Sequence, residues 1–185
     1  MHDRHAYVGL GSNLGDRAGN LLLAVRGMIG AGLRVSRLSS VYETEPVGVP
    51  TAQPLFLNMV AEIAFDTDTD DVAPPAPEQL LARLLRIEYA LGRRRERARA
   101  ARTLDLDLLL YGDTESQTLF LVLPHPRLHL RRFVLAPLVE LAPDLRHPTL
   151  RQTFRQLLAD TPDQSSVKLW RAKSKAEGGK SLKES

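Results

Sequence analysis

Residues 102–111 read Arg-Thr-Leu-Asp-Leu-Asp-Leu-Leu-Leu-Tyr, and this stretch decides both the fold class and the chemistry of the chain. Apolar and polar residues alternate along it, which is the period of an extended strand. We therefore expect every second leucine from Leu104 to Leu110 to share one face, and Asp105 and Asp107 to point together from the other. The stretch predicts a strand that packs on a core with one face and presents two neighbouring carboxylates with the other.

Two carboxylates held side by side repel each other, so each raises the pKa of the other unless a cation neutralises both. The chain has no cysteine, so a bound metal must have oxygen or imidazole ligands, and Mg²⁺ prefers oxygen. The alternative is a solvated edge strand that shows both acids to water. The apolar flanks and the arginines upstream favour a metal, and we expect Asp105 and Asp107 to bind it.

A cluster of six arginines precedes the two acids, opposed within its own span only by Glu96. Guanidinium groups make forked contacts with phosphate oxygens, and carboxylates hold a metal against the same oxygens, so the two halves together suit phosphoryl transfer. An exposed helix end or an RNA-binding arm is the alternative, but an RNA-binding surface has no use for two acids without a metal. The cluster consists of Arg93, Arg94, Arg95, Arg97, Arg99 and Arg102.

The rest of the chain predicts strands and helices without regular βαβ alternation, which favours an α+β layered domain. Strands are expected over residues 6–10, 33–42, 56–65 and 103–111, and helices over 17–30, 78–91, 134–141 and, for a short last helix, 150–158. A long loop is expected over 43–54 and an acidic, proline-bearing surface insertion over 66–77. We place one domain at 1–160 and a flexible C-terminal tail, with at best a docked turn, at 161–185.

A glycine-rich run, Gly9-Leu10-Gly11-Ser12-Asn13-Leu14-Gly15, follows the first strand. Its spacing is one residue too long for a dinucleotide fingerprint, and no Gly-Lys-Ser/Thr follows it as a phosphate-binding P-loop would require. We interpret it as a tight turn from strand to helix that starts at Gly11, with Asp16 as the helix N-cap. Ser12 and Asn13 remain candidates to frame a site.

Length and composition restrict the class of protein. A chain of 185 residues, 43% of them hydrophobic, suits one domain with one core. The absence of cysteine excludes a disulfide-stapled scaffold, a zinc ribbon and a thiol nucleophile. No stretch approaches the roughly 18 apolar residues of a membrane span, and the N-terminus has no secretory signal, so we expect a cytoplasmic location.

Two further groups of residues suggest binding surfaces. Asn58 and Phe56 share a face of the third expected strand, and with Phe133 they could form a pocket for a planar heterocycle. Core packing is the commoner role of such phenylalanines. The proline-braced segment 124–132 concentrates two histidines and three arginines, and its His125 lies between two prolines, which indicates a positioned rather than a solvated side chain.

Five motifs together resemble the 6-hydroxymethyl-7,8-dihydropterin pyrophosphokinase family of folate biosynthesis, over roughly residues 6–148. The resemblance implies a ferredoxin-like α+β fold, an αββα sandwich with a central, mostly antiparallel sheet. It also implies transfer of the pyrophosphoryl group of ATP to the hydroxymethyl group of a reduced pterin, with release of AMP. The motifs are Tyr7-Val8-Gly9-Leu10-Gly11-Ser12-Asn13-Leu14-Gly15, Thr44-Glu45-Pro46-Val47-Gly48, Phe56-Leu57-Asn58, Arg102-Thr103-Leu104-Asp105-Leu106-Asp107 and Pro124-His125-Pro126-Arg127.

The resemblance also implies roles for individual residues. Two Mg²⁺ ions would bind Asp105 and Asp107, which with Arg93 and Arg102 form the catalytic set. The pterin would contact Thr44, Val47, Phe56, Asn58 and Phe133, and ATP would contact Glu88, Arg93, Arg95, Arg102, His125 and Arg131. We expect the loop 93–99 to close over ATP. The expected partners are these two small molecules, with no nucleic acid and no membrane, and the expected state is a monomer.

Overall fold

The computed structural model describes residues 5–48, 53–65, 73–93 and 101–172. Its helices are α1 (Arg17–Gly30), α2 (Pro77–Ala90), α3 (Arg132–Leu141) and α4 (Phe154–Asp160), with a short 3-10 turn η1 (Leu128–Leu130) before α3. Its strands are β1 (His5–Ser12), β2 (Arg34–Leu38), β3 (Tyr42–Thr44), β4 (Phe56–Ala64), β5 (Asp105–Tyr111), β6 (Ser116–Gln117), β7 (Val122–Leu123) and β8 (Val167–Leu169). None of the helices in these ranges is long and apolar enough to cross a membrane.

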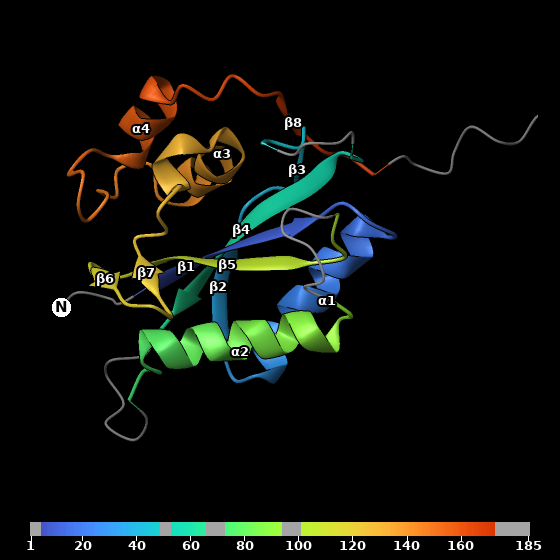
Figure 1. Ribbon diagram of the computed structural model, residues 1–185, viewed down its shortest axis with the longest axis horizontal. Helices are drawn as coiled ribbons and strands as arrows, with labels where there is room; N and C mark the ends of the chain where they lie inside the picture. The colour runs from blue at the N-terminus through green and yellow to red at the C-terminus, as the bar shows by residue number, and fades with distance from the viewer. Residues whose placement is uncertain (1–4, 49–52, 66–72, 94–100, 173–185) are drawn as a thin grey trace, which may run out of the picture.

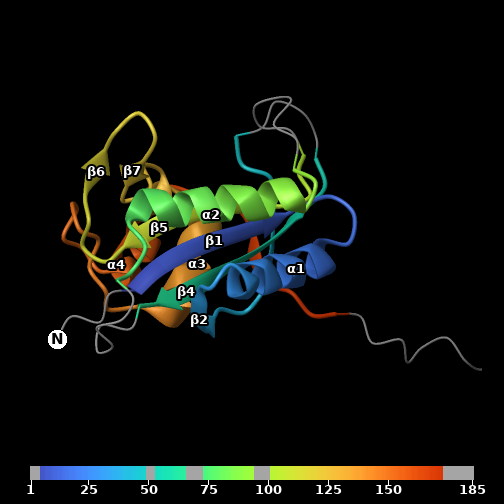
Figure 2. The same ribbon diagram turned by 90° about the horizontal axis from the view of Figure 1, so that it is seen from below.

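The main sheet has the strand order β5-β1-β4-β3-β8, with β2 also paired to β4, and every pairing in it is antiparallel. Helices α1 and α2 cover one face of the sheet, and α3 with α4 covers the other (Figures 1 and 2). The predicted α+β sandwich with a central antiparallel sheet is therefore confirmed. The strands β6 and β7 form a separate small hairpin.

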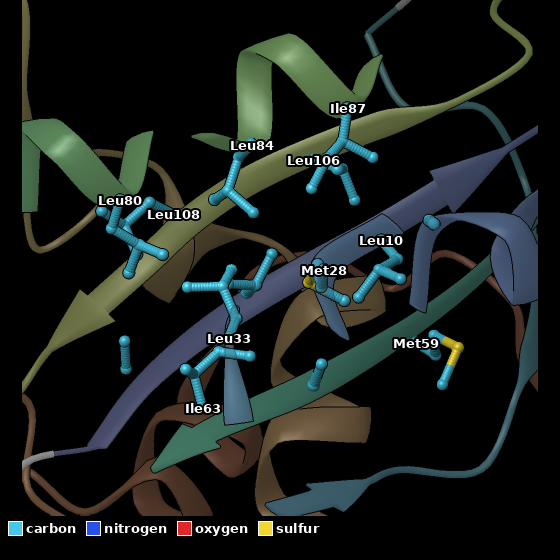
Figure 3. Close-up of a cluster of buried hydrophobic side chains, with 14 of the residues drawn as sticks. Leu10, Met28, Leu33, Met59, Ile63, Leu80, Leu84, Ile87, Leu106 and Leu108 are labelled. Carbon is cyan, nitrogen blue, oxygen red and sulfur yellow. The ribbon is translucent and has the colours of Figure 1, made fainter. Parts of the chain in front are cut away.

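Apolar side chains fill both sides of the sheet. The larger cluster lies between the sheet and α1 and α2, where Leu10, Leu84 and Leu106 meet (Figure 3). The second lies under α3 and α4 and includes Leu109, Leu135 and Phe154. Because β1, β4 and β5 are covered on both faces, they are the rigid part of the fold, and polar groups at their ends are held firmly.

The predicted α1 is confirmed, including its cap. The Asp16 carboxylate accepts a hydrogen bond of 3.0 Å from the Gly19 backbone N–H. The turn before the helix needs Gly15, whose φ of 65° lies in the left-handed region that favours glycine. The predicted turn begins too early, however, because β1 continues through Gly11 to Ser12.

The strict alternation predicted for β5 is wrong at its far end. Val8 of β1 pairs with Leu108 and Tyr7 pairs with Leu110, so Leu109 is an extra residue in the ladder. At this β-bulge the side chains change sides, and Leu110 joins Leu109 in the α3 cluster instead of packing with Leu106. The two acids precede the bulge and keep the face predicted for them.

Three further boundaries differ from prediction. The strand expected over 33–42 is two strands, because Ser39 leaves the ladder and both its N–H and its Oγ bond to the backbone of Val60. Helix α3 begins at Arg132, two residues before the predicted start, which puts Phe133 in its first turn. Helix α4 begins only at Phe154, where the Thr153 side chain caps it.

The C-terminal segment is more ordered than predicted. Residues 167–169 form β8 on the edge of the main sheet, beside β3, so the prediction of a flexible tail from residue 161 is wrong for this part of the chain. Residues 173–185 lie outside the described residues, as do 66–72 of the predicted insertion, whose last member Pro77 is the first residue of α2.

Candidate active site

A cavity of about 490 Å³ lies on the α3 face of the sheet, over β1, β4 and β5. It brings together segments from five separate parts of the sequence. Eleven of the thirteen predicted site residues line it; of the other two, Glu88 is not in its lining and Arg95 lies outside the described residues. The eleven are Thr44, Val47, Phe56, Asn58, Arg93, Arg102, Asp105, Asp107, His125, Arg131 and Phe133.

The floor of the cavity is formed by the start of β5 beside β1. Asp105 pairs with Gly11 and Asp107 with Gly9, so glycines lie opposite both acids. A Cβ atom on Gly11 would lie 2.8 Å from Oδ1 of Asn58, a distance that real Cβ contacts do not reach. Gly9 and Gly11 both line the cavity and were missed as site residues; the signal was their i, i+2 spacing, which puts both on one face of a strand.

Asp105 is held between two arginines. Its Oδ1 accepts a hydrogen bond of 2.6 Å from Nη1 of Arg93, and its Oδ2 pairs with Arg102. Arg93 also pairs with Glu88, which is buried behind the cavity and accepts a 2.7 Å hydrogen bond from the Leu106 N–H. Glu88 therefore fixes Arg93 and the β5 backbone from behind the cavity, and its contact with ATP stays a prediction.

Asp107 has no such compensation. Burial and then the charge of Asp105 raise its pKa to about 6, while Arg131 opposes the shift. Its backbone is paired with β1, but its carboxylate has no side-chain ion pair within the described ranges, and these ranges contain no group of three or more metal-ligating side chains. Two adjacent carboxylates, one of them short of positive partners, fit a hard divalent cation whose remaining ligands come from phosphate and water.

The opposite wall combines amide, hydroxyl and aromatic groups. Asn58 Nδ2 donates a 2.7 Å hydrogen bond to Thr44 Oγ1, which joins β4 to β3 at the edge of the cavity. Phe56 lies two residues before Asn58 on the same face, as predicted. The Arg131 guanidinium carbon lies 5.5 Å from the centre of the Phe133 ring. This wall offers both ring faces and hydrogen-bonding groups to a planar ligand.

His125 is a neutral imidazole at pH 7. Burial first, and then the charges of Arg131 and Arg127, lower its pKa to about 4. Its Nδ1 accepts a 3.2 Å hydrogen bond from the Arg127 N–H, so the proton is on Nε2. The prediction that His125 is positioned rather than solvated is confirmed, because its backbone N–H also donates to Leu109 O at 2.9 Å.

Asn13 connects the loops on the two sides of the cavity. Its Oδ1 accepts a 2.7 Å hydrogen bond from the Arg102 N–H, and its own N–H donates to Arg102 O at 3.1 Å. Its Nδ2 donates to Gln53 Oε1 at 3.2 Å. Asn13 is buried and frames the site by fixing its loops; Ser12, the other candidate, bonds to Asn20. Residues 94–99 of the loop expected to close over ATP, Arg95 among them, lie outside the described residues.

Comparison with known proteins identifies the family. The family model described as 7,8-dihydro-6-hydroxymethylpterin-pyrophosphokinase (HPPK) matches residues 7–143. The chain belongs to the HPPK family. The Bacillus subtilis 2-amino-4-hydroxy-6-hydroxymethyldihydropteridine pyrophosphokinase is 39% identical over 170 residues, which are 91% of this chain and 92% of that protein. The Methylorubrum extorquens protein of the same name is 45% identical over 141 residues, 76% of this chain and 84% of its own.

Solved structures agree on the fold. An HPPK-DHPS structure in complex with substrates superposes with a TM-score of 0.62 at 14% identity, over 85% of this chain and 43% of that chain. A Plasmodium falciparum HPPK-DHPS superposes with a TM-score of 0.63 at 15% identity, over 85% of this chain and 45% of that chain. The HPPK family membership establishes the reaction predicted from the motifs: pyrophosphoryl transfer from ATP to hydroxymethyl-dihydropterin, in folate biosynthesis.

Proposed function

We propose that this HPPK binds ATP and the pterin side by side in the cavity described above, and that Asp105 and Asp107 hold two Mg²⁺ ions between them. The observation that supports this most strongly is the pairing of the two acids on one face of β5, inside a cavity whose other wall carries Phe56, Asn58 and Phe133. The charged floor suits a triphosphate and the aromatic wall suits a pterin ring.

The metal ions, when bound, supply charge neutralisation at the phosphate oxygens. The residues of the chain do the rest. Arg93 and Arg102 already lie against Asp105, and on ATP binding we expect both guanidinium groups to shift part of their hydrogen bonding to phosphate oxygens. His125 presents an N–H at Nε2 and, being neutral, can donate one hydrogen bond to a phosphate without adding charge.

The reaction requires no covalent enzyme intermediate. The pterin hydroxyl oxygen forms a bond to the β-phosphorus of ATP and gives up its proton to water, and the bond from that phosphorus to the oxygen bridging the α- and β-phosphates breaks, which releases AMP. Catalysis then depends on alignment and on stabilising charge in the transition state. The pterin edge is read by Asn58 and by groups near Thr44 and Val47, and its ring is held by Phe56 and Phe133.

We also propose, as expected above, that the enzyme acts as a monomer. Light scattering of the purified protein during size-exclusion chromatography tests this directly. The expected cytoplasmic location stays a prediction.

The decisive experiment mixes the protein with ATP, Mg²⁺ and 6-hydroxymethyl-7,8-dihydropterin and identifies the nucleotide product by chromatography. AMP in equal amount to the pterin diphosphate is the expected result. ADP would instead indicate transfer of a single phosphoryl group. Asp105→Asn in the same assay should give no AMP above background while its circular dichroism spectrum stays that of the wild type.

A further inference from the structure

The last described segment of the chain returns to the sheet beside the cavity. After α4, the segment Thr161–Trp170 runs along α3 and then along the edge strand β3 (Figure 1). β8 pairs with β3 in antiparallel register, with Val167 opposite Thr44, and the Trp170 N–H donates to Val41 O at 2.8 Å. Trp170 itself packs against the larger core cluster, so the segment is anchored at this end.

The strand that β8 covers carries one wall of the cavity. β3 has only three residues, and Thr44, its last, lines the cavity and accepts the hydrogen bond from Asn58. A strand this short has few ladder bonds of its own, and pairing on both sides fixes it in place. The β8 pairing therefore bears directly on where Thr44 lies.

The other anchor of the segment is Asp163, which contacts the first residue of α3. Its Oδ2 accepts a 2.8 Å hydrogen bond from the Arg132 N–H, and its Oδ1 accepts a 2.9 Å hydrogen bond from the Ser165 N–H. The N-cap residue of α3, Arg131, makes no side-chain cap of its own. A carboxylate at this place satisfies a free helix N–H and interacts favourably with the helix dipole.

The residues on either side of this contact lie in the cavity wall. Arg131 precedes the capped N–H and Phe133 follows it, and both line the cavity, whereas no residue of Thr161–Trp170 does. The segment thus touches both walls of the proposed pterin pocket, the β3 wall through β8 and the α3 wall through Asp163, without touching the ligand space.

We propose that Thr161–Trp170 is a strap that sets the spacing of the two pterin-binding walls, and that Asp163 is the positioning residue that holds Phe133 in place. This inference rests on the proposed function, because it assigns the pterin to the pocket between these walls. The class of ligand affected is the planar heterocycle and not the nucleotide.

The test compares Asp163→Ala with Asp144→Ala, which removes a carboxylate that is 84% exposed and lies away from the cavity. Loss of a helix cap should weaken pterin affinity by about threefold to tenfold in calorimetry and raise the pterin KM by a similar factor, with kcat and the ATP KM within about twofold. Hydrogen exchange at the amides of residues 132–134 should accelerate in Asp163→Ala. Asp144→Ala should change none of these quantities.

Asp163→Asn keeps an oxygen acceptor but loses the charge, so its pterin affinity should lie between those of the wild type and Asp163→Ala. It also serves where the alanine variant fails to fold. Unchanged pterin affinity in the folded variants, or an equal loss in kcat and both KM values, would overturn the strap. Absence of AMP from the wild-type enzyme would instead overturn the proposed function, and the hydrogen-exchange result would still report on Asp163.

Discussion

Glu62 and Asp107 have opposite electrostatic surroundings. Both carboxylates lie on the α3 face of the sheet, on the two strands that flank β1. Glu62 on β4 is 3% exposed and accepts hydrogen bonds from Tyr7 Oη at 2.9 Å, Ser36 Oγ at 2.7 Å and Arg37 Nε at 2.9 Å. Burial opposes ionisation of Glu62, but these donors, Arg37 foremost, lower its pKa to about 2. Asp107 on β5, with a pKa raised to about 6, has the reverse balance.

The difference separates a structural acid from a functional one. Glu62 has enough donors to stay charged without help, and Arg37 continues the network to the carbonyl of Leu141 at the end of α3. Burial and the charge of Asp105 outweigh the arginines that face Asp107, so a bound cation would favour its ionised form. A carboxylate left short of partners in a cavity is the pattern expected where a metal or substrate binds. The contrast is open to direct tests.

The largest effect is expected from Asp107→Asn. Removal of one metal-binding carboxylate should lower the rate of AMP formation by at least about a thousandfold, because metal-held charge contributes several kcal/mol to the transition state. Thermal stability should be unchanged or slightly higher, since repulsion with Asp105 disappears. Single-turnover AMP assays and calorimetry measure the two quantities. Activity within tenfold of the wild type would show that Asp107 is not a functional acid.

Glu62→Ala should give the converse result. It leaves Tyr7 and Arg37 without their acceptor, and breaking such a pair costs about 3 kcal/mol of unfolding free energy, the lower figure applying because Arg37 is half-exposed. Where the variant is folded, its kcat should stay within about threefold of the wild type. Urea unfolding measures the loss of stability, and steady-state kinetics measures kcat. A stable variant with lost activity would reverse the contrast between the two acids.

The same contrast predicts a dependence of stability on pH. Glu62 has a lower pKa in the folded than in the unfolded protein, so its contribution is complete above the unfolded value of about 4.5 and is lost as the pH falls toward 2. The contribution is about 3 kcal/mol. In urea titrations between pH 6 and 2, Glu62→Gln should lose less stability than the wild type. Parallel curves for the two proteins would contradict the assignment.

Local patterns in the sequence were enough to find Asp107, and long-range contacts explain why Glu62 was missed. The two acids of β5 follow from a period of two within one strand. The donors of Glu62 lie 25 to 55 residues away in the sequence, on β1 and β2, so nothing near Glu62 marks it. The bulge at Leu109 and the pairing of β8 likewise depend on the partner strand. The role of Glu88 follows from the family resemblance alone, and its bonds to Arg93 and to the Leu106 N–H are visible only in the structure.

Arg102→Ala tests the contribution of a positive charge beside the two acids. Its guanidinium pairs with Asp105, while its backbone is fixed by Asn13 and is unaffected by the substitution. The rate of AMP formation should fall by at least about tenfold, the modest end of an arginine contribution to phosphoryl transfer. Arg127→Ala, which removes another arginine of the same cavity, provides the comparison. An equal fall in both variants would indicate general attraction of the nucleotide by positive charge instead of a specific contact.

The smallest effect is expected from Phe133→Ala, which leaves both acids and their arginines in place. Loss of one ring face should weaken pterin binding by about threefold to tenfold, because aromatic pairs contribute about 0.5–1.5 kcal/mol beyond their buried area. Phe120→Ala is the matched control, since that ring is 85% exposed and does not line the cavity. The Mg²⁺ concentration for half-maximal rate should be the same in both variants, because neither substitution removes a charge and both acids stay on β5. A shift in that concentration with Phe133→Ala would mean that the aromatic wall and the acidic floor are not independent. The difference between Glu62 and Asp107 would then depend on the Phe133 ring as well as on the charges around each acid.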